Sequence, residues 1–163
     1  MIVIVMGVSG SGKSTLAAQL VERTGWNYAE GDDYHSEANR AKMHAGIPLT
    51  DEDRLPWLDA LHAVLAGWQT QSVSGVLTCS ALKEIYRDRL LSGISAGRIV
   101  WLDPPRALLE QRLTARTGHY MNPKLLDSQL ATLEVPHGDA VLRLAGGESP
   151  EQQADSVIAW LGL

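Results

Sequence analysis

The sequence predicts an α/β fold with a parallel sheet, and three observations indicate it. Apolar stretches of four to six residues alternate with longer stretches of helical spacing. The first apolar stretch is uninterrupted, as in a strand buried on both faces. A glycine-rich turn then joins it to the first helical stretch. A chain of 163 residues has the length of one domain, so we treat residues 1–163 as a single domain.

The elements follow in order from these patterns. Met1–Met6 is the first expected strand, and Lys13–Arg23 is the first helix because its apolar residues recur at helical spacing before Gly25. Short apolar stretches bounded by turn residues predict further strands at Asn27–Gly31, Val76–Cys79, Arg98–Leu102 and Val141–Leu144. Helical spacing predicts helices near Asp53–Thr70, Ala81–Leu91, Pro105–Thr117 and Pro150–Leu161. The less regular segments 32–53 and 118–137 are expected over the carboxyl edge of the sheet, where such folds bind ligands.

Composition excludes several classes of protein. The net charge of −5, from 14 basic and 19 acidic residues, argues against a nucleic-acid partner. No apolar stretch reaches the length of about 20 residues that crosses a bilayer, so no membrane partner is expected. A single cysteine, Cys79, cannot form an intrachain disulfide, which fits a reducing, cytoplasmic location. Small-molecule partners are expected, and whether the chain forms a homodimer stays open.

The turn after the first strand carries a phosphate-binding pattern. Gly7-Val8-Ser9-Gly10-Ser11-Gly12-Lys13-Ser14 fits G-x-x-x-x-G-K-[ST] between a strand and a helix. Its glycines let backbone N–H groups turn toward a polyphosphate, Lys13 reaches the β- and γ-phosphates, and the Ser14 hydroxyl ligates Mg²⁺. The predicted ligands are ATP and Mg²⁺, and the predicted nucleotide site is Gly7, Val8, Ser9, Gly10, Ser11, Gly12, Lys13, Ser14 and Thr15. Since the GTPase patterns D-x-x-G and N-K-x-D do not occur, a small kinase fits best.

Asp32 follows the second expected strand and is placed to face the γ-phosphate. A carboxylate there can accept the proton of an acceptor hydroxyl, bind Mg²⁺ through water, or do both. The simpler alternative is a solvated loop acid or a helix N-cap.

Beyond these patterns, the chain resembles the gluconate kinases, a family of small P-loop kinases, from residue 1 to about 137. The first group of matching residues is Gly31-Asp32, His35, Asn39, Lys42-Met43, Gly46, Pro48-Leu49, Asp51, Asp53-Arg54 and Pro56-Trp57-Leu58. The second is Cys79-Ser80-Ala81-Leu82-Lys83 with Tyr86-Arg87-Asp88, and the third is Arg112, Arg116, Gly118-His119, Ser128-Gln129, Leu133-Glu134 and Pro136.

The resemblance implies a fold similar to nucleoside-monophosphate and shikimate kinases, with a five-stranded parallel sheet in the order 2-3-1-4-5. It also implies ATP-dependent phosphorylation of D-gluconate at the 6-hydroxyl, giving 6-phospho-D-gluconate. An acceptor-binding insertion at about 32–53 and a lid at about 117–137 complete this expectation. Two alternatives stay open: a kinase for shikimate, a nucleoside monophosphate or another sugar acid, and a catalytically silent nucleotide-binding sensor.

A sugar acid needs cations for its carboxylate and hydrogen-bonding groups for its hydroxyls. Arg54 stands at an expected helix start, and Lys83 and Arg87 lie four residues apart on an expected helix. The alternative for all three is a solvated surface charge. His35 and His119 can hydrogen-bond the sugar acid, or they pack within loops. The predicted substrate site is therefore Asp32, His35, Arg54, Lys83, Arg87 and His119.

Two arginines near the expected lid complete the predicted site. In kinases that resemble this chain, arginines here stack on adenine or neutralise the transferring phosphoryl group. We assign the adenine side to Arg112 and the phosphate side to Arg116. The alternative is that both complement the helix dipole. The predicted catalytic residues are thus Lys13, Asp32 and Arg116.

Overall fold

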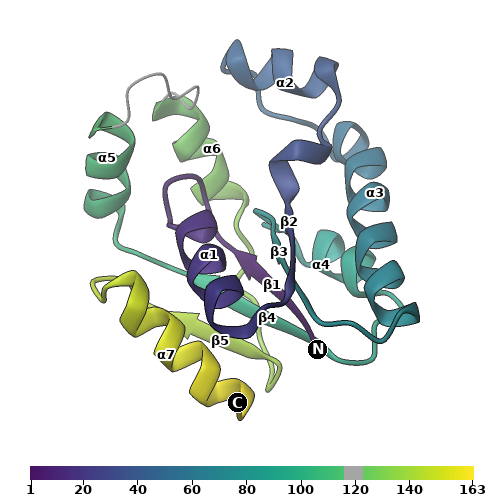
Figure 1. The fold of residues 1–163 in the computed structure, drawn as a ribbon. Coiled ribbons are helices and arrows are strands. Elements are labelled where there is room, and N and C mark those ends of the chain that lie inside the picture. The colour runs from purple at the N-terminus through teal and green to yellow at the C-terminus, as the bar shows by residue number, and fades with distance from the viewer. Residues whose placement is uncertain (116–122) are drawn as a thin grey trace.

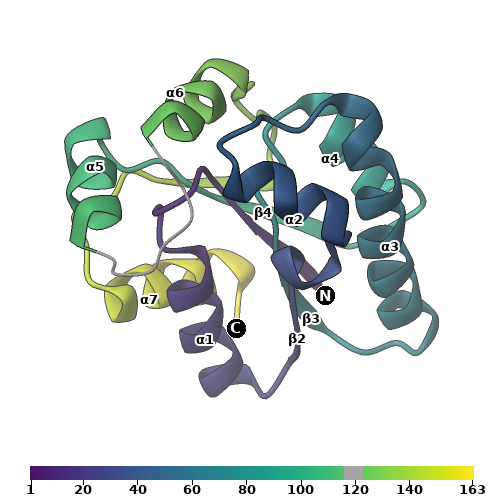
Figure 2. The ribbon, with the colours of Figure 1, turned by 90° about the horizontal axis from the view of Figure 1, so that it is seen from above.

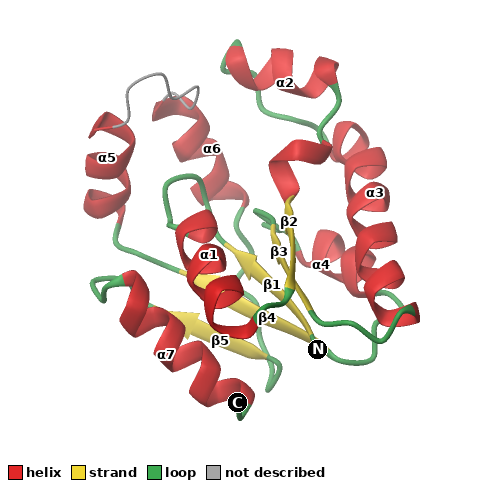
Figure 3. Cartoon of the chain, in the orientation of Figure 1, coloured by secondary structure: helices red, strands yellow, loops and turns green. Residues whose placement is uncertain are grey.

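The computed structural model of the chain describes residues 1–115 and 123–163, and these form a parallel five-stranded sheet between two layers of helices (Figure 1). The strand order is β2-β3-β1-β4-β5, which confirms the predicted order. The strands are β1 (Ile2–Met6), β2 (Asn27–Glu30), β3 (Gly75–Thr78), β4 (Gly97–Leu102) and β5 (Val141–Leu144). Figure 3 shows them side by side with helices on both faces.

The central strand β1 is apolar along its whole length because helices cover both sides of it. Ile2, Ile4 and Met6 face helices α3 (Asp51–Thr70) and α4 (Glu84–Leu91). Val3 and Val5 face α1 (Lys13–Thr24) and α7 (Pro150–Leu161). Alternate residues of one strand thus enter two separate cores, as the period of two of a β-strand requires. A third, smaller cluster lies at the carboxyl edge, where Val8 and Leu82 pack on α5 (Arg106–Ala115) and α6 (Pro123–Thr132).

Two of the expected element starts are corrected by the structure. Helix α3 begins at Asp51, two residues before the predicted start, because Thr50 and Asp53 form a capping box around its first turn. Helix α4 begins at Glu84, three residues after the predicted start. Ala81 has a φ of 47°, which no right-handed helix contains, and Lys83 is the N-cap.

The two irregular segments contain helices that the sequence pattern did not predict. A short 3-10 helix η1 (Gly31–Tyr34) and helix α2 (Glu37–His44) follow β2, and the Ser36 side chain caps α2 by accepting the Asn39 N–H. Helix α6 lies within the second segment. Figure 1 shows α2 and α6 on the side of the sheet toward which β1 runs, and Figure 2, seen from above, shows α2 in front of the strands. Of the described helices, none has the length and apolar character needed to cross a membrane.

Candidate functional site

The loop between β1 and α1 is shaped for an anion. Gly7, Gly10 and Gly12 have φ values of 150°, 81° and 100°, which side-chain-bearing residues rarely adopt. A Cβ atom on Gly7 would stand 2.8 Å from the Leu102 carbonyl oxygen. The N-cap of α1 is Gly12, which supplies no capping side chain, and the first turn carries no acid. The positive end of the helix and its first N–H groups are therefore left for an anionic ligand.

Lys13 and Ser14 stand at the start of α1, beside this loop. The Lys13 ammonium donates to the carbonyl oxygens of Gly7 and Val8, at 3.0 Å each. It thus lies across the loop, at the place where a phosphate would meet it. The Ser14 hydroxyl donates to Glu30 Oε2 at 2.6 Å.

Glu30, at the end of β2, collects three hydroxyl donors and is a functional candidate that the sequence reasoning missed. Besides Ser14, it accepts from Thr78 Oγ1 at 2.6 Å and from the Tyr28 hydroxyl. Burial alone would raise the pKa of Glu30, but these hydrogen bonds outweigh burial and lower it. Glu30 is therefore a carboxylate whose bond fixes the Ser14 hydroxyl. Glu30 stands at the carboxyl end of β2, which only β3 separates from the strand before the phosphate loop. This position was the sequence feature that could have identified it.

A cavity of about 330 Å³ opens beside the phosphate loop. Its walls come from the loop, from segment 32–49, from α3, from the turn after β3 and from α6. The lining residues are Ser9, Lys13, Asp32, His35, Arg40, Met43, His44, Ile47, Pro48, Leu49, Arg54, Trp57, Ser80, Leu125, Ser128 and Gln129. The structure therefore brings five predicted site residues of the loop and the acceptor side together: Ser9, Lys13, Asp32, His35 and Arg54.

Asp32 lines this cavity because β2 and β3 approach closely at their ends. A Cβ atom on Gly31 would lie 2.2 Å from the Thr78 carbonyl oxygen, and Trp57 Nε1 donates to the Gly31 carbonyl at 2.8 Å. The Asp32 side chain is open to the cavity but crowded by protein atoms, and this burial raises its pKa. Lys13 opposes the rise, while Glu30 adds to it. A carboxylate with a raised pKa is a stronger base than an ordinary aspartate.

Arg40 of α2 supports the turn that carries Asp32, and it too was missed from the sequence. Its guanidinium donates to the carbonyl oxygens of Asp33 at 3.1 Å, His35 at 3.3 Å and Asp32 at 3.4 Å. It also lines the cavity, so it adds positive charge there. Because α2 was not predicted, there was no expected helix face from which Arg40 could be oriented toward the site.

His35 is buried and stacks on Trp57, with ring centroids 4.1 Å apart. Burial, together with the charges of Arg54 and Arg40, lowers the pKa of His35 to about 4. The imidazole is therefore neutral at physiological pH. A neutral imidazole can donate or accept one hydrogen bond at the cavity, and it carries no charge for a carboxylate.

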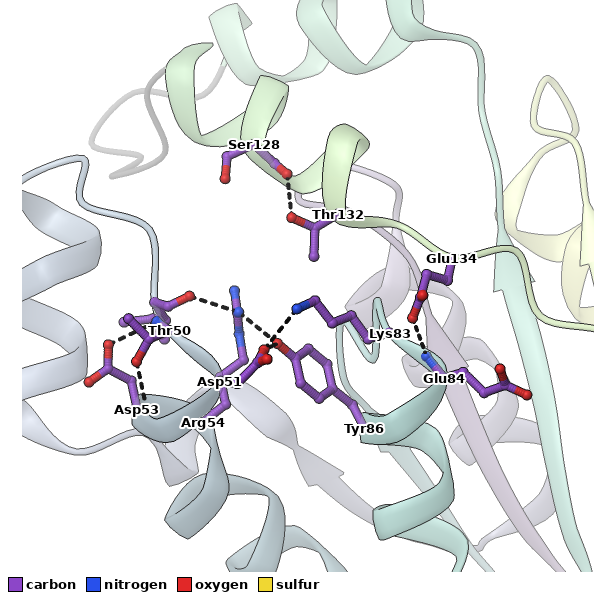
Figure 4. Close-up of polar contacts among 11 residues, drawn as sticks. Thr50, Asp51, Asp53, Arg54, Lys83, Glu84, Tyr86, Ser128, Thr132 and Glu134 are labelled. Carbon is purple, nitrogen blue, oxygen red and sulfur yellow. Dashed lines mark hydrogen bonds and ion pairs between the residues drawn. The ribbon is translucent and has the colours of Figure 1, made fainter.

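Arg54 reaches the cavity from the first turn of α3 and is held from behind. Its Nη1 donates to the Leu49 carbonyl at 2.8 Å and to the Tyr86 hydroxyl at 2.9 Å. The Tyr86 hydroxyl in turn donates to Asp51, which also accepts from Lys83 at 2.9 Å. Figure 4 shows Arg54, Tyr86 and Lys83 converging beside Asp51. These hydrogen bonds, from Tyr86 first and then from Lys83, lower the pKa of Asp51.

Lys83 and Arg87, which were expected to bind substrate, are not among the residues that line the cavity. Lys83 is the N-cap of α4 and forms the ion pair with Asp51, so the two residues do not share a helix face. Arg87 is buried and donates to the carbonyl oxygens of Ala81 at 2.8 Å and Leu82 at 3.0 Å. Its guanidinium stabilises the turn before α4, because that turn leaves those carbonyl groups without helix partners.

Arg112 lies against the phosphate loop, as a nucleotide-side residue would. Its Nη1 donates to the carbonyl oxygens of Gly10 at 3.2 Å and Ser11 at 3.1 Å. Arg116 and His119, the predicted phosphate and substrate residues of the lid, lie outside the described residues.

The arrangement combines three chemical capacities in one place. The loop can hold a polyphosphate, Asp32 can take a proton, and Arg54 with Arg40 can attract an anion. A phosphoryl donor and an alcohol-bearing anion could therefore meet between the loop and Asp32.

Comparisons with known proteins agree with this geometry. A family model described as an AAA domain matches residues 2–136. The gluconokinase of Gluconobacter oxydans (strain 621H) is 46% identical over 156 residues, which cover 95% of this chain and 88% of that protein.

Solved structures give the same result. An unliganded sugar kinase from Janibacter sp. HTCC2649 is 44% identical with a TM-score of 0.93, covering 99% of this chain and 94% of that one. A gluconokinase from Sinorhizobium meliloti 1021 is 39% identical with a TM-score of 0.88, covering 98% and 90%. A shikimate kinase from Aquifex aeolicus, 15% identical with a TM-score of 0.57, shares the fold alone. The phosphate loop, the cavity and these likenesses together place the chain in the gluconokinase family of small P-loop kinases.

Proposed function

We propose that the chain transfers the γ-phosphoryl group of ATP to the 6-hydroxyl of D-gluconate, giving 6-phospho-D-gluconate and ADP. The observation that carries the proposal is the cavity that Lys13, Asp32 and Arg54 line together. Its walls include both the phosphate loop, through Ser9 and Lys13, and the guanidinium-bearing side chain of Arg54. Its volume of about 330 Å³ suits a small molecule. The gluconokinases to which the chain is similar support gluconate as that molecule.

In the proposed reaction, Asp32 accepts the proton of the 6-hydroxyl as the hydroxyl oxygen bonds to the γ-phosphorus. The bond from that phosphorus to the β–γ bridging oxygen breaks, and ADP leaves with the electron pair. The raised pKa of Asp32 favours this proton transfer. Lys13 exchanges its bonds to the Gly7 and Val8 carbonyls for bonds to the phosphate oxygens. Arg116 is proposed to neutralise the same oxygens from the lid.

The oxygen atoms near the loop suit Mg²⁺. Within residues 1–115 and 123–163, no three His, Cys, Asp or Glu side chains group as a metal cage. Mg²⁺ in kinases is held by few protein oxygens together with the phosphates of the nucleotide, so such a cage is not needed. Ser14 would hold the ion directly, and Glu30 and Asp32 would hold its water ligands. The ion supplies neutralisation of phosphate charge when it is bound.

The acceptor side is proposed to work as follows. Arg54 binds the gluconate carboxylate, and the neutral His35 imidazole forms a hydrogen bond with one of the gluconate hydroxyl groups. Segment 32–53 acts as the acceptor-binding insertion and segment 117–137 as a lid that excludes water. Lys83 and Arg87 are proposed to support the site indirectly. Lys83 donates to the Asp51 carboxylate, and Arg87 donates to the Ala81 carbonyl oxygen.

The test is release of ADP from MgATP across a panel of acceptors: D-gluconate, shikimate, AMP and D-glucose. Turnover is expected with gluconate and not with glucose, which lacks the carboxylate. Preference for shikimate or AMP would contradict gluconate as substrate while leaving a kinase. ATP binding without turnover on any member would favour the nucleotide sensor.

A further inference from the structure

One polar contact joins the phosphate loop to the helix that covers the cavity. The backbone N–H of Ser9 donates to Gln129 Oε1 at 2.7 Å, across 120 residues of sequence. Gln129 belongs to α6, and both residues line the cavity together with Lys13 and Asp32. The Gln129 carboxamide therefore lies where the nucleotide side and the acceptor side of the proposed site meet.

The packing of α6 does not depend on this contact. Leu126, 1% exposed, packs with Val8, Leu82 and Leu109 in the apolar cluster at the sheet edge. Leu130 and Leu133 extend the same contact. Apolar burial therefore positions the helix. The hydrogen bond to Ser9 instead fixes the rotamer of one side chain.

The donor on Ser9 also fixes which end of the carboxamide faces the loop. A backbone N–H can only donate, so the atom opposite it must be the oxygen of Gln129. The NH₂ group then becomes the remaining polar end of a side chain that lines the cavity. It carries two donors and no acceptor capacity.

We propose that Gln129 is an acceptor-binding residue whose NH₂ group donates to a hydroxyl oxygen at the reacting end of the sugar acid. This inference rests on the proposed function. Asp32 needs the hydroxyl proton, so the hydroxyl oxygen has lone pairs left for a donor from another side. The Ser9 contact holds that donor in place before substrate arrives, which lowers the entropy cost of aligning the two reactants.

The test compares Gln129→Met and Gln129→Glu with the wild-type enzyme. Methionine has similar length and neither polar end. Glutamate keeps an oxygen for the Ser9 N–H and loses the NH₂ donors. Steady-state rates with gluconate, binding of ATP by calorimetry and thermal melting are measured for each. Gln71→Met, the same substitution at an exposed position at the C-terminal end of α3, is the matched control.

In both Gln129 variants, kcat/KM for gluconate is expected to fall about 10-fold or more, and the Kd for ATP of Gln129→Met to stay within about threefold. Gln71→Met should keep the wild-type values. Retention of kcat/KM in Gln129→Glu would show that only the Ser9 anchor matters and would overturn the proposal. A loss of ATP affinity in Gln129→Met as large as its loss of kcat/KM for gluconate would also overturn the proposal. If Gln129→Met fails to fold, Gln129→Glu decides alone. Failure of the wild-type enzyme on gluconate would instead refute the proposed function.

Discussion

At the scale of single residues, Asp32 is placed by its neighbours rather than by its own contacts. Because Gly31 has no side chain, the end of β2 lies against the Thr78 carbonyl. Trp57 donates a hydrogen bond to the Gly31 carbonyl oxygen, and Arg40 donates to three carbonyl oxygens of the following turn. Asp32 thereby lines the same cavity as Lys13. Burial there raises its pKa, which suits a general base.

Replacing this carboxylate tests its role as the base. Asp32→Asn should lower kcat by about 10²- to 10⁴-fold, because the amide cannot accept the hydroxyl proton. ATP affinity should change little, since the phosphate loop is untouched. Kinetics and ATP titration measure the two effects. The adjacent Asp33→Asn, whose side chain does not line the cavity, is the control and should keep near-normal turnover. Near-normal turnover of Asp32→Asn would remove the base assignment.

His35 makes the stability of the fold depend on pH. Its pKa falls from 6.5 to about 4 on folding, so below pH 6.5 the unfolded chain binds a proton that the folded chain does not. Stability is therefore lost as the pH falls from about 6.5 toward 4.

Between pH 7 and pH 5 this single group should remove about 2 kcal/mol of unfolding free energy. Urea unfolding at both pH values measures the loss. His35→Gln should lose about 2 kcal/mol less than the wild type over this interval. The exposed His137→Gln, the control, should show the wild-type loss. Equal losses in wild type and His35→Gln would show that the imidazole is not held neutral.

Some site residues could be predicted from the sequence, and others could not. The phosphate loop is a local pattern, and Asp32 follows a strand directly, so spacing alone sufficed for both. Lys83 and Arg87 were assigned to a shared helix face, but the positive φ of Ala81 delays the start of α4. Helical spacing carries no information about such a turn. Glu30, Arg40 and Gln129 depend on contacts between distant segments.

At the scale of elements, the junction of α3 and α4 links the cavity to the packed layer behind it. Tyr86, 2% exposed, presents its hydroxyl between Arg54 and Asp51 and its ring to the Arg54 guanidinium. The helix that buries its ring in the core therefore also orients the cation of the other helix. An arginine held in this way loses less rotamer entropy when it binds a carboxylate.

Removing one hydroxyl group tests this junction. Tyr86→Phe should raise the KM for gluconate about 3- to 10-fold through a less ordered Arg54, and leave the KM for ATP unchanged. Arg89→Gln is the matched control, because the Arg89–Asp59 pair also joins α3 to α4 but is exposed and lies outside the cavity. It should leave both constants unchanged. An unchanged KM for gluconate in Tyr86→Phe would show that Arg54 needs no support.

Elements with strong periodicity were predicted from the sequence, and the short ones over the sheet edge were not. All five strands, and helices α1, α3, α4, α5 and α7, match expected stretches to within a few residues. Helix α2 has only eight residues, and most of them are polar or exposed. Helix α6 packs through Leu126 onto residues from three other segments. The pattern of its apolar residues indicates a helix only once the segments that they pack against are known.

At the scale of the whole molecule, a net acidic chain gathers positive charge at one cavity. Lys13, Arg40 and Arg54 line it, and Arg112 lies against the adjoining loop. The order of the strands explains this, because β1 and its neighbours end at the same edge and helices α2 and α6 lie on that side of the sheet (Figure 1). Two anionic substrates can therefore be attracted to one place.

Nucleotide binding should stabilise the whole fold, since only the folded loop presents its N–H groups together. At 100 times its Kd, ATP should add about 2.7 kcal/mol to the unfolding free energy, measured by denaturation with and without nucleotide. Lys13→Met should lose most of this gain. Arg89→Met, which removes an exposed positive charge outside the cavity, is the control and should keep it. A gain that persists in Lys13→Met would place the nucleotide elsewhere.

The central claim is that the cavity joins a phosphoryl donor to the far hydroxyl of a sugar acid. Incubation of the wild-type protein with MgATP and D-gluconate, followed by mass and NMR identification of the product, tests it most directly. We predict one added phosphoryl group, on the oxygen of carbon 6, together with an equal amount of ADP. Unchanged gluconate, or a phosphoryl group on any other oxygen, would contradict the account.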